Sequence, residues 1–209
     1  MLSFFSGLGL GLSLIIAIGA QNAYLLRQGI RREHVLTVVV ICTVSDAVLI
    51  LAGVAGLGYL IERVPWLVVA AQWLGAAFLL VYGILAGARA LRGSAAGLTP
   101  DAPDARPSGN GRLAAVALTT LALTWLNPHV YLDTVLMLGS IAATHGSARW
   151  VFAAGAITAS ILWFTALGYG ARRLSGRLST PRAWRILDGV IAVIMIGLAA
   201  TLVVQALQV

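Results

Sequence analysis

The sequence predicts an all-α integral membrane protein with six transmembrane helices arranged as two inverted three-helix repeats. Of its 209 residues, 60% are hydrophobic and 10% are charged, and the mean hydropathy is +0.94, far outside the range of soluble domains. Two apolar segments carry polar interruptions at matching places, Ala20-Gln21-Asn22-Ala23 and Leu126-Asn127-Pro128-His129. A broken membrane helix is tolerated only beside protein or a wet cavity, so matched breaks in two halves are typical of a transporter's substrate site.

Six apolar segments are long enough to cross a hydrocarbon core about 30 Å thick, which needs about 20 residues. The expected spans are 2–26, 35–61, 66–91, 113–143, 149–171 and 184–207. The first segment lacks the charged start and the cleavage site of a signal peptide, so we expect a retained helix.

The fourth segment is too long for one straight helix, because its length would be roughly 46 Å at 1.5 Å per residue. We expect two half-helices meeting at Asn127-Pro128, since proline removes a backbone donor and clashes with the preceding turn. The first segment is the other candidate for a break, and a milder one, because Asn22 lies nearer its helix end. A partly re-entrant first or fourth segment would leave five full spans.

The distribution of charge predicts the topology. All 14 basic residues are arginine, and 12 of them follow the first, third or fifth span. These are Arg27, Arg31, Arg32, Arg89, Arg92, Arg106, Arg112, Arg172, Arg173, Arg177, Arg182 and Arg185. By the positive-inside rule the odd-numbered loops are cytoplasmic and both termini lie outside. The arginines therefore anchor topology, and a nucleic-acid partner is not expected.

Three matches between the halves favour an ancient duplication, with residues 1–91 as the first repeat, 92–111 as a flexible cytoplasmic linker and 112–209 as the second repeat. Because each unit has three spans, its second copy enters the membrane from the opposite face. The matches are Asn22 with Asn127, Leu57-Gly58-Tyr59 with Leu167-Gly168-Tyr169, and Gly75 and Gly83 with Gly189 and Gly197. Glycines such as Gly53, Gly56, Gly75 and Gly197 are expected to permit close helix packing.

Two acids lie deep inside the expected spans, where their cost makes them informative. Asp46 follows Ser45 in the second span, and Asp133 lies beyond Pro128 in the fourth. Their carboxyl groups are protonated, paired with an arginine such as Arg27, or available to bind a cation. The alternative to a functional role is that each is a hydrogen-bonded packing residue.

Four other polar features are candidates. Asp188 is expected to be a first-turn acid or an interfacial ion-pair partner. His129 is either a proton relay or a hydrogen-bonded side chain at the break. A freed helix N-terminus at Pro128 would suit a carboxylate, although a packed proline kink explains the same residue. Gln21 is an amide that could face a cavity.

The sequence argues against most other classes of protein. The single cysteine, Cys42, excludes a disulfide framework. The sequence has no HExxH or GxSxG motif and no cysteine–histidine cluster, so no enzyme, metal or cofactor is expected. A passive channel remains the competing class.

The chain resembles the LysE-type amino-acid exporters, and in particular the branch that exports lysine and arginine. The resemblance is carried by Gly19-Ala20-Gln21-Asn22-Ala23, which continues to His34, and by Ser45-Asp46 in the second span. Further matches are Leu126-Asn127-Pro128 through Tyr131-Leu132-Asp133, and Asp188-Gly189. It covers nearly the whole chain except the linker.

The resemblance implies export of lysine, arginine or close analogues from the bacterial cytoplasm across the inner membrane. As a mechanism we expect alternating access about a site near the junction of the repeats, coupled to the proton motive force. Implied partners are a basic amino acid, the lipid bilayer and protons, and a homo-oligomer is left open. Neutral amino acids or another small cationic solute are the alternative substrates. The expected site residues are Gln21, Asn22, Asp46, Asn127, Pro128 and Asp133, with Ser45, His129 and Asp188 as further candidates.

Overall fold

The computed structural model describes residues 1–16, 19–57, 65–92, 109–175 and 180–208. The elements are α1 (Leu2–Ile15), α2 (Ala20–Arg31), α3 (Val35–Val54), α5 (Pro65–Arg92), α6 (Gly109–Trp125), α7 (Pro128–Val130), the π-helix η1 (Tyr131–Met137), α8 (Leu138–Thr144), the 3₁₀ turn η2 (Gly146–Ala148), α9 (Arg149–Leu174) and α10 (Pro181–Ala206). Helices are the only regular structure in these ranges, which confirms the predicted all-α class. Most of the predicted linker 92–111 and the motif Leu57-Gly58-Tyr59 lie outside the described residues.

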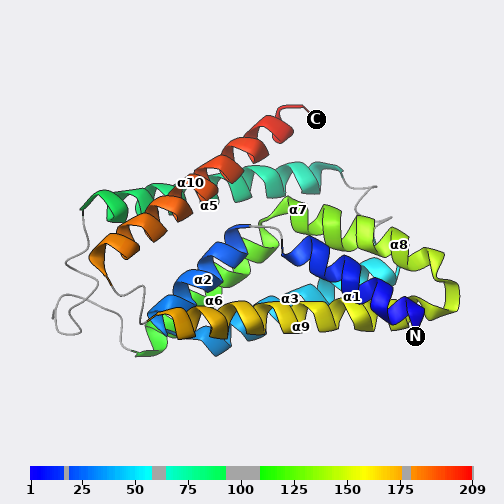
Figure 1. Cartoon of the computed structure of the whole chain (residues 1–209). Helices are drawn as coiled ribbons and strands as arrows, with labels where there is room; N and C mark the ends of the chain where they lie inside the picture. Colours follow the sequence, from blue (N-terminus) through cyan, green and yellow to red (C-terminus); the bar gives the residue numbers. More distant parts are fainter. Residues whose placement is uncertain (17–18, 58–64, 93–108, 176–179, 209) are drawn as a thin grey trace.

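Four helices, α3, α5, α9 and α10, are each long and apolar enough to cross a membrane. Two bent pairs bring the number of candidate spans to six if each pair is one span: α1 with α2, and α6 with the continuous run α7–η1–α8. In Figure 1 each bent pair runs from one end of the molecule to the other, and its bend lies near the middle. The chain is therefore a multi-pass membrane protein.

The first break lies earlier in the chain than its polar residues suggested. Helix α1 ends at Ile15, and Ala20-Gln21-Asn22-Ala23 form the first turn of α2. Gly19 precedes that turn in an extended conformation, with φ −115° and ψ 175°. The two axes are inclined by 81°, against 58° at the second break, so the expectation of a milder first distortion is wrong. The polar Asn22 hydrogen-bonds the broken end of α1 and does not cause the break.

The second break lies where it was predicted. Asn127 is the N-cap of α7 in an extended conformation, and buried Pro128 is the first helical residue. The Asn127 amide oxygen accepts a hydrogen bond from the His129 backbone N–H at 3.2 Å. The hydroxyl of Tyr131 donates to the Trp125 carbonyl at 2.7 Å, which satisfies one of the acceptors that the end of α6 leaves without an intrahelical partner.

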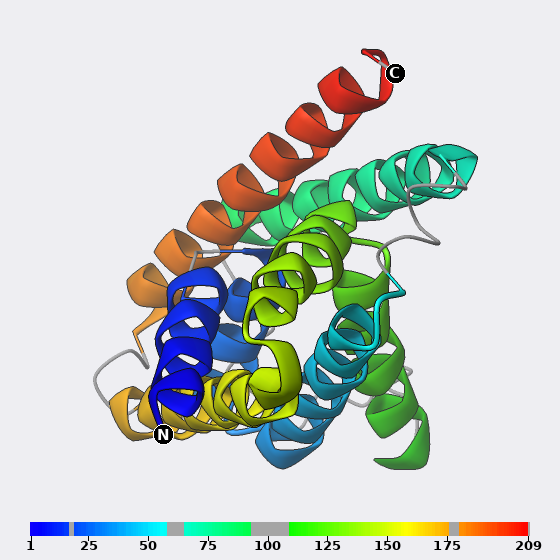
Figure 2. The same cartoon turned by 90° about the vertical axis from the view of Figure 1, so that its right-hand side faces the viewer.

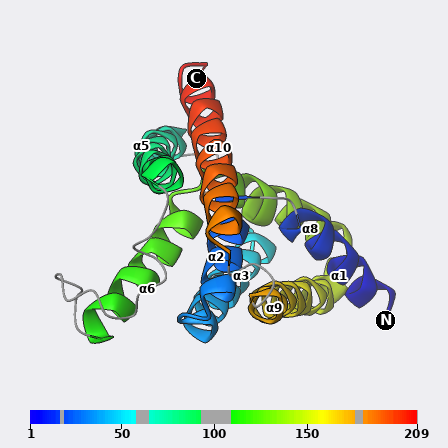
Figure 3. The same cartoon turned by 60° about the vertical axis from the view of Figure 1, so that its left-hand side comes forward.

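Each broken span packs on a helix from the other half of the chain. Helix α9 contacts both α1 and α2, while α3 contacts α6, η1 and α8. The third helices of the two halves, α5 and α10, pack on each other, and Figures 2 and 3 show them crossing on one side of the bundle, away from α9.

Glycines let some of these backbones approach closely. A Cβ on Gly53 of α3 would lie 2.7 Å from the Val135 carbonyl oxygen, and one on Gly139 would lie 2.6 Å from that of Gly53. Gly75 sits against the Leu126 carbonyl at the second break. The same expectation is wrong for Gly56 and Gly197, because neither has an atom within 4 Å of its added Cβ.

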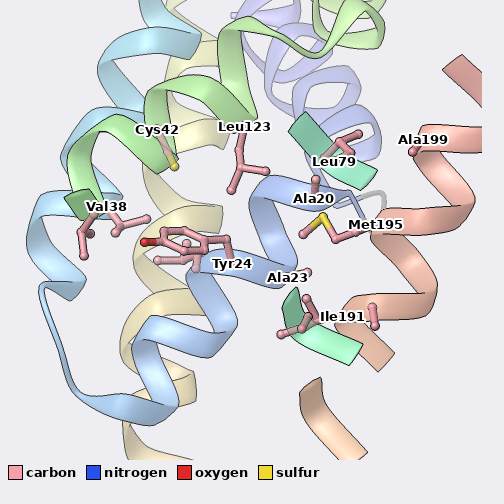
Figure 4. Close-up of a cluster of buried hydrophobic side chains, with 14 of the residues drawn as sticks. Ala20, Ala23, Tyr24, Val38, Cys42, Leu79, Leu123, Ile191, Met195 and Ala199 are labelled. Carbon is pink, nitrogen blue, oxygen red and sulfur yellow. The ribbon is translucent and has the colours of Figure 1, made fainter. Parts of the chain in front are cut away.

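Arginine-bearing helix ends gather at one end of the molecule. The C-terminal ends of α2, α5 and α9 and the N-terminal ends of α6 and α10 lie together, opposite the two chain termini (Figure 1). A buried apolar cluster that includes Tyr24, Cys42 and Ile191 lies behind this end and continues along α10 to Ala199 and Leu202 (Figure 4). A second cluster, including Ile50 and Phe152, fills the opposite half.

Candidate functional site

The two breaks share one cavity of about 300 Å³, a size at the lower end of the range for small-molecule sites. Six of the sequence-predicted residues line it: Gln21, Asn22, Asp46, Asn127, His129 and Asp133. The first two come from α2, Asp46 comes from α3, and the other three come from the second break. Tertiary packing thus brings polar residues of both halves to one place, and the cavity lining contains two carboxylates and no arginine.

Asp46 lies in the middle of α3 and is 7% exposed. Its Oδ2 accepts a hydrogen bond from the Ser160 hydroxyl of α9 at 2.9 Å. Arg27, the cation considered as its partner, pairs elsewhere. One hydrogen bond leaves most acceptor positions of the carboxylate available to a ligand, because a carboxylate offers about four.

Asp133 lies in η1, the seven-residue π-helix that follows the second break. Its side chain is half-buried at the cavity wall. Within the described ranges, no hydrogen bond or ion pair occupies its carboxylate. Short π-helical stretches within α-helices are frequent at functional sites, and this one sets the position of Asp133 relative to the cavity.

Both polar atoms of the Asn22 side-chain amide form hydrogen bonds within the protein. Its Nδ2 donates to the Ile15 carbonyl at 2.8 Å, and its Oδ1 accepts from the Trp163 indole N–H at 3.2 Å. Asn22 therefore joins the end of α1 to α9. Its neighbour Gln21 also lines the cavity, and its side chain lies beside the Cys42 thiol of α3.

The N-termini of the two inner helices are not equivalent. Asn127 caps the helix that starts at Pro128 with its own side chain. Helix α2 has no side-chain cap at Gly19, and Gly19, Ala20 and Gln21 all line the cavity. The first N–H groups of a helix lack intrahelical partners and carry partial positive charge. The uncapped end that faces the cavity is therefore that of α2, whereas the sequence suggested the one at Pro128.

Three other predicted residues do not line the cavity. Pro128 is buried and acts through the backbone break. The hydroxyl of Ser45 accepts a hydrogen bond from the Trp125 indole at 3.1 Å, which ties α3 to the end of α6. Asp188 lies at the arginine-rich end of the bundle, away from both aspartates of the cavity.

Asp188 is buried between two guanidinium groups. Its Oδ1 lies 3.3 Å from Arg27 Nε and 3.6 Å from Arg89 Nε. Arg27 also donates to the Tyr82 hydroxyl at 3.2 Å. The prediction of a first-turn acid is wrong, since α10 begins at Pro181 and Asp188 lies two turns further on. The ion pairing that was expected is present, and it joins α2, α5 and α10.

Four residues that position the site were not found by sequence reasoning. They are Ser160 and Trp163 of α9, and Trp125 and Tyr131 at the second break. Each is a polar group within an apolar run, and that was the available signal. Their partners lie 6 to 141 positions away in the chain, so the sequence could not identify them.

These features define the class of protein: a multi-pass membrane protein with a polar internal cavity at two interrupted helices, which is a membrane transport protein. The profile of the LysE type translocator family matches residues 12–206. The chain belongs to this family. Its members are translocators, so the protein is a transporter and not an enzyme.

Relatives match over nearly their whole length. A candidate amino-acid transporter of Mycobacterium tuberculosis is 47% identical over 195 residues, covering 93% of this chain and 94% of the relative. An arginine exporter of Klebsiella pneumoniae is 43% identical, with coverage of 92% and 89%. A lysine exporter of Corynebacterium diphtheriae is 39% identical, with coverage of 96% and 98%. No solved structure matches the chain.

Proposed function

We propose that this protein exports basic L-amino acids, arginine or lysine, from the cytoplasm. The observation that carries this proposal is the cavity with two aspartates and no arginine at the junction of two broken spans. Relatives named as arginine and lysine exporters at 43% and 39% identity support the same substrate class. A bound guanidinium or ammonium would supply the positive charge that the cavity lining lacks.

The cavity offers complementary groups for the two ends of a basic amino acid. Asp46 and Asp133 would bind the cationic side chain, because charge-assisted hydrogen bonds to carboxylates are the strong ones. The uncapped N-terminus of α2 would bind the α-carboxylate, as helix N-termini do with anions. Gln21 would add its side-chain amide at that end, since it lines the same cavity. Asn22 and Asn127 then hold the two broken helix ends in place around the substrate.

Transport would proceed by alternating access. The two apolar clusters would have to rearrange for the cavity to open first to one side of the membrane and then to the other. At the arginine-rich end the contacts of Asp188 with Arg27 and Arg89 add a closure between α2, α5 and α10. We infer that this ion cluster breaks when the site opens to the cytoplasm. The two cavity aspartates would exchange the cation for protons, which couples export to the proton motive force.

The packing pattern supports two inverted repeats. Each broken span packs against the second helix of the other half, and the third helices pair with each other. We propose residues 1–91 and 112–209 as the repeats, joined by a cytoplasmic linker at 92–111. In this arrangement the odd-numbered loops face the cytoplasm of a bacterial inner membrane, and both termini lie outside.

Counterflow in proteoliposomes tests the substrate class. Vesicles loaded with unlabelled arginine should accumulate labelled arginine transiently, and external lysine, ornithine or canavanine should compete. Neutral amino acids should compete poorly. If no basic amino acid competes, the substrate assignment is wrong.

Export against a gradient distinguishes the transporter from a passive channel. Inside-out vesicles energised with a proton gradient should concentrate arginine in their lumen, and an uncoupler should abolish the accumulation. Equal fluxes with and without the gradient would instead indicate a channel.

A further inference from the structure

A second hollow, of about 670 Å³, lies beside the C-terminal end of α9, apart from the central cavity. Its lining includes three arginines, Arg32, Arg172 and Arg173, and no acidic residue among those that the structure describes. We call it the α9 pocket. Other arginines at this end of the molecule face carboxylates, since Arg31 and Arg112 both contact Glu33. The α9 pocket therefore concentrates positive charge that the described part of the chain does not neutralise.

Arg32 is held in position at the edge of this pocket. It ends α2 in the left-handed conformation with φ 56°. Its Nε donates to the Ser175 hydroxyl at 2.7 Å, and that hydroxyl donates to the Arg172 carbonyl at 2.8 Å. The terminal guanidinium nitrogens of Arg32 take no part in this chain of hydrogen bonds. No ion pair is present for Arg32, Arg172 or Arg173 within the ranges that the structure describes.

The apolar side of the α9 pocket continues toward the middle of the membrane. Ala166 and Tyr169 line the pocket, and the Tyr169 side chain is exposed, as is that of Leu162, one turn from Ala166 toward the N-terminal end of α9. Leu162, Ala166 and Tyr169 share one exposed helix face because they are spaced by four and three positions. Tyrosine favours the membrane–water interface, where its ring is apolar and its hydroxyl is wet. The arginines thus lie at headgroup level, above an exposed apolar stripe.

We propose that the α9 pocket binds the headgroup phosphate of an anionic phospholipid. Arginine binds phosphate through two parallel N–H···O hydrogen bonds, and basic pockets between membrane helices suit anionic lipid headgroups. The contiguous apolar stripe favours a lipid over a soluble phosphate, because an acyl chain can lie along it. Bound there, the lipid would link Arg32 at the end of α2 to α9, the helix on which both halves of the first broken span pack.

Lipid retention by the purified full-length protein tests this site. Native mass spectrometry in detergent would compare phosphatidylglycerol with phosphatidylcholine for the wild type, for Arg172→Gln combined with Arg173→Gln, and for Arg32→Gln. Each arginine near an anionic headgroup contributes about fivefold in affinity, so the double variant should bind phosphatidylglycerol about 25-fold more weakly. Arg149→Gln is the matched control, since Arg149 is exposed and lies at the other end of α9.

Several outcomes would overturn the proposal. Equal phosphatidylglycerol retention by the double variant and by Arg149→Gln would show that the α9 pocket does not bind the lipid. Equal binding of phosphatidylcholine would remove its charge specificity. Displacement of the lipid by millimolar inorganic phosphate would show a soluble-anion site instead. Replacing Arg172 and Arg173 by lysine should preserve part of the binding, which distinguishes lost charge from misfolding. None of these measurements depends on transport, so they do not test the proposed function.

Discussion

Replacing Asp46 by Asn should weaken transport of basic amino acids much more than it disturbs the fold. The change keeps the size of the side chain, and its amide oxygen can still accept the hydrogen bond that Ser160 donates at 2.9 Å. It removes one of the two carboxylates in a cavity of about 300 Å³. A substrate cation that enters this space exchanges its hydration for those carboxylates.

The size of the effect follows from the kind of contact that is lost. A hydrogen bond to a charged group contributes about 1.5–3 kcal/mol net, which corresponds to about 10- to 150-fold in affinity. The upper part of that range applies if the bound cation contacts Asp46 directly, because the side chain is 7% exposed and water can replace it poorly.

The assay is arginine counterflow at several substrate concentrations, with protein amount in the vesicles measured by immunoblot. We expect a KM raised by about 10- to 150-fold. Ser160→Ala is the control, because it removes the hydrogen-bond donor and keeps the charge, and its KM should change less than about fivefold. A wild-type KM in Asp46→Asn would refute the assignment of Asp46 to the cation.

Two further changes test the closure and the packing. Asp188→Asn leaves two guanidinium groups without their carboxylate, and breaking a buried ion pair costs about 3–5 kcal/mol. A permeant maleimide should then label the buried Cys42 at least tenfold faster than in the wild type. Glu33→Gln is the control and should not change the labelling rate. An unchanged labelling rate would argue against a gate at Asp188. Gly53→Ala places a Cβ 2.7 Å from a backbone carbonyl of η1, so overpacking of about 1–3 kcal/mol should lower the Tm in detergent by several degrees. Gly197→Ala has open space at this position and should melt like the wild type, and equal melting of both variants would refute the close contact.

The membrane spans were predictable because their signal is local. A run of about 20 apolar residues crosses the bilayer whatever its neighbours are, and a proline inside such a run breaks the helix wherever it occurs. The second break was found at the right residues for this reason. The first break was misplaced, because Asn22 looks like its cause in the sequence but is the residue that bonds the broken end of α1.

The partners of the charged residues could not be predicted, because they depend on which helices become neighbours. Arg27 and Asp46 are both buried and lie 19 positions apart, yet Arg27 pairs with Asp188, which is 161 positions away. The glycine spacing was equally ambiguous. Gly75 and Gly197 look alike in the sequence, but only Gly75 meets another backbone.

By itself, the sequence showed that this protein lies in a membrane, where its candidate spans are and which polar residues are candidates for the site. These properties can be predicted because hydropathy and helix breaking act over a few residues. Only the tertiary structure decided that six of those polar residues line one cavity and that α2 has the uncapped helix end there. It also decided that Asp46 and Asp133 form no ion pair with a described arginine. These facts depend on the packing of α9 and α3 against broken spans from the other half of the chain. Such packing follows from the complementary shapes of distant segments, which no local pattern records.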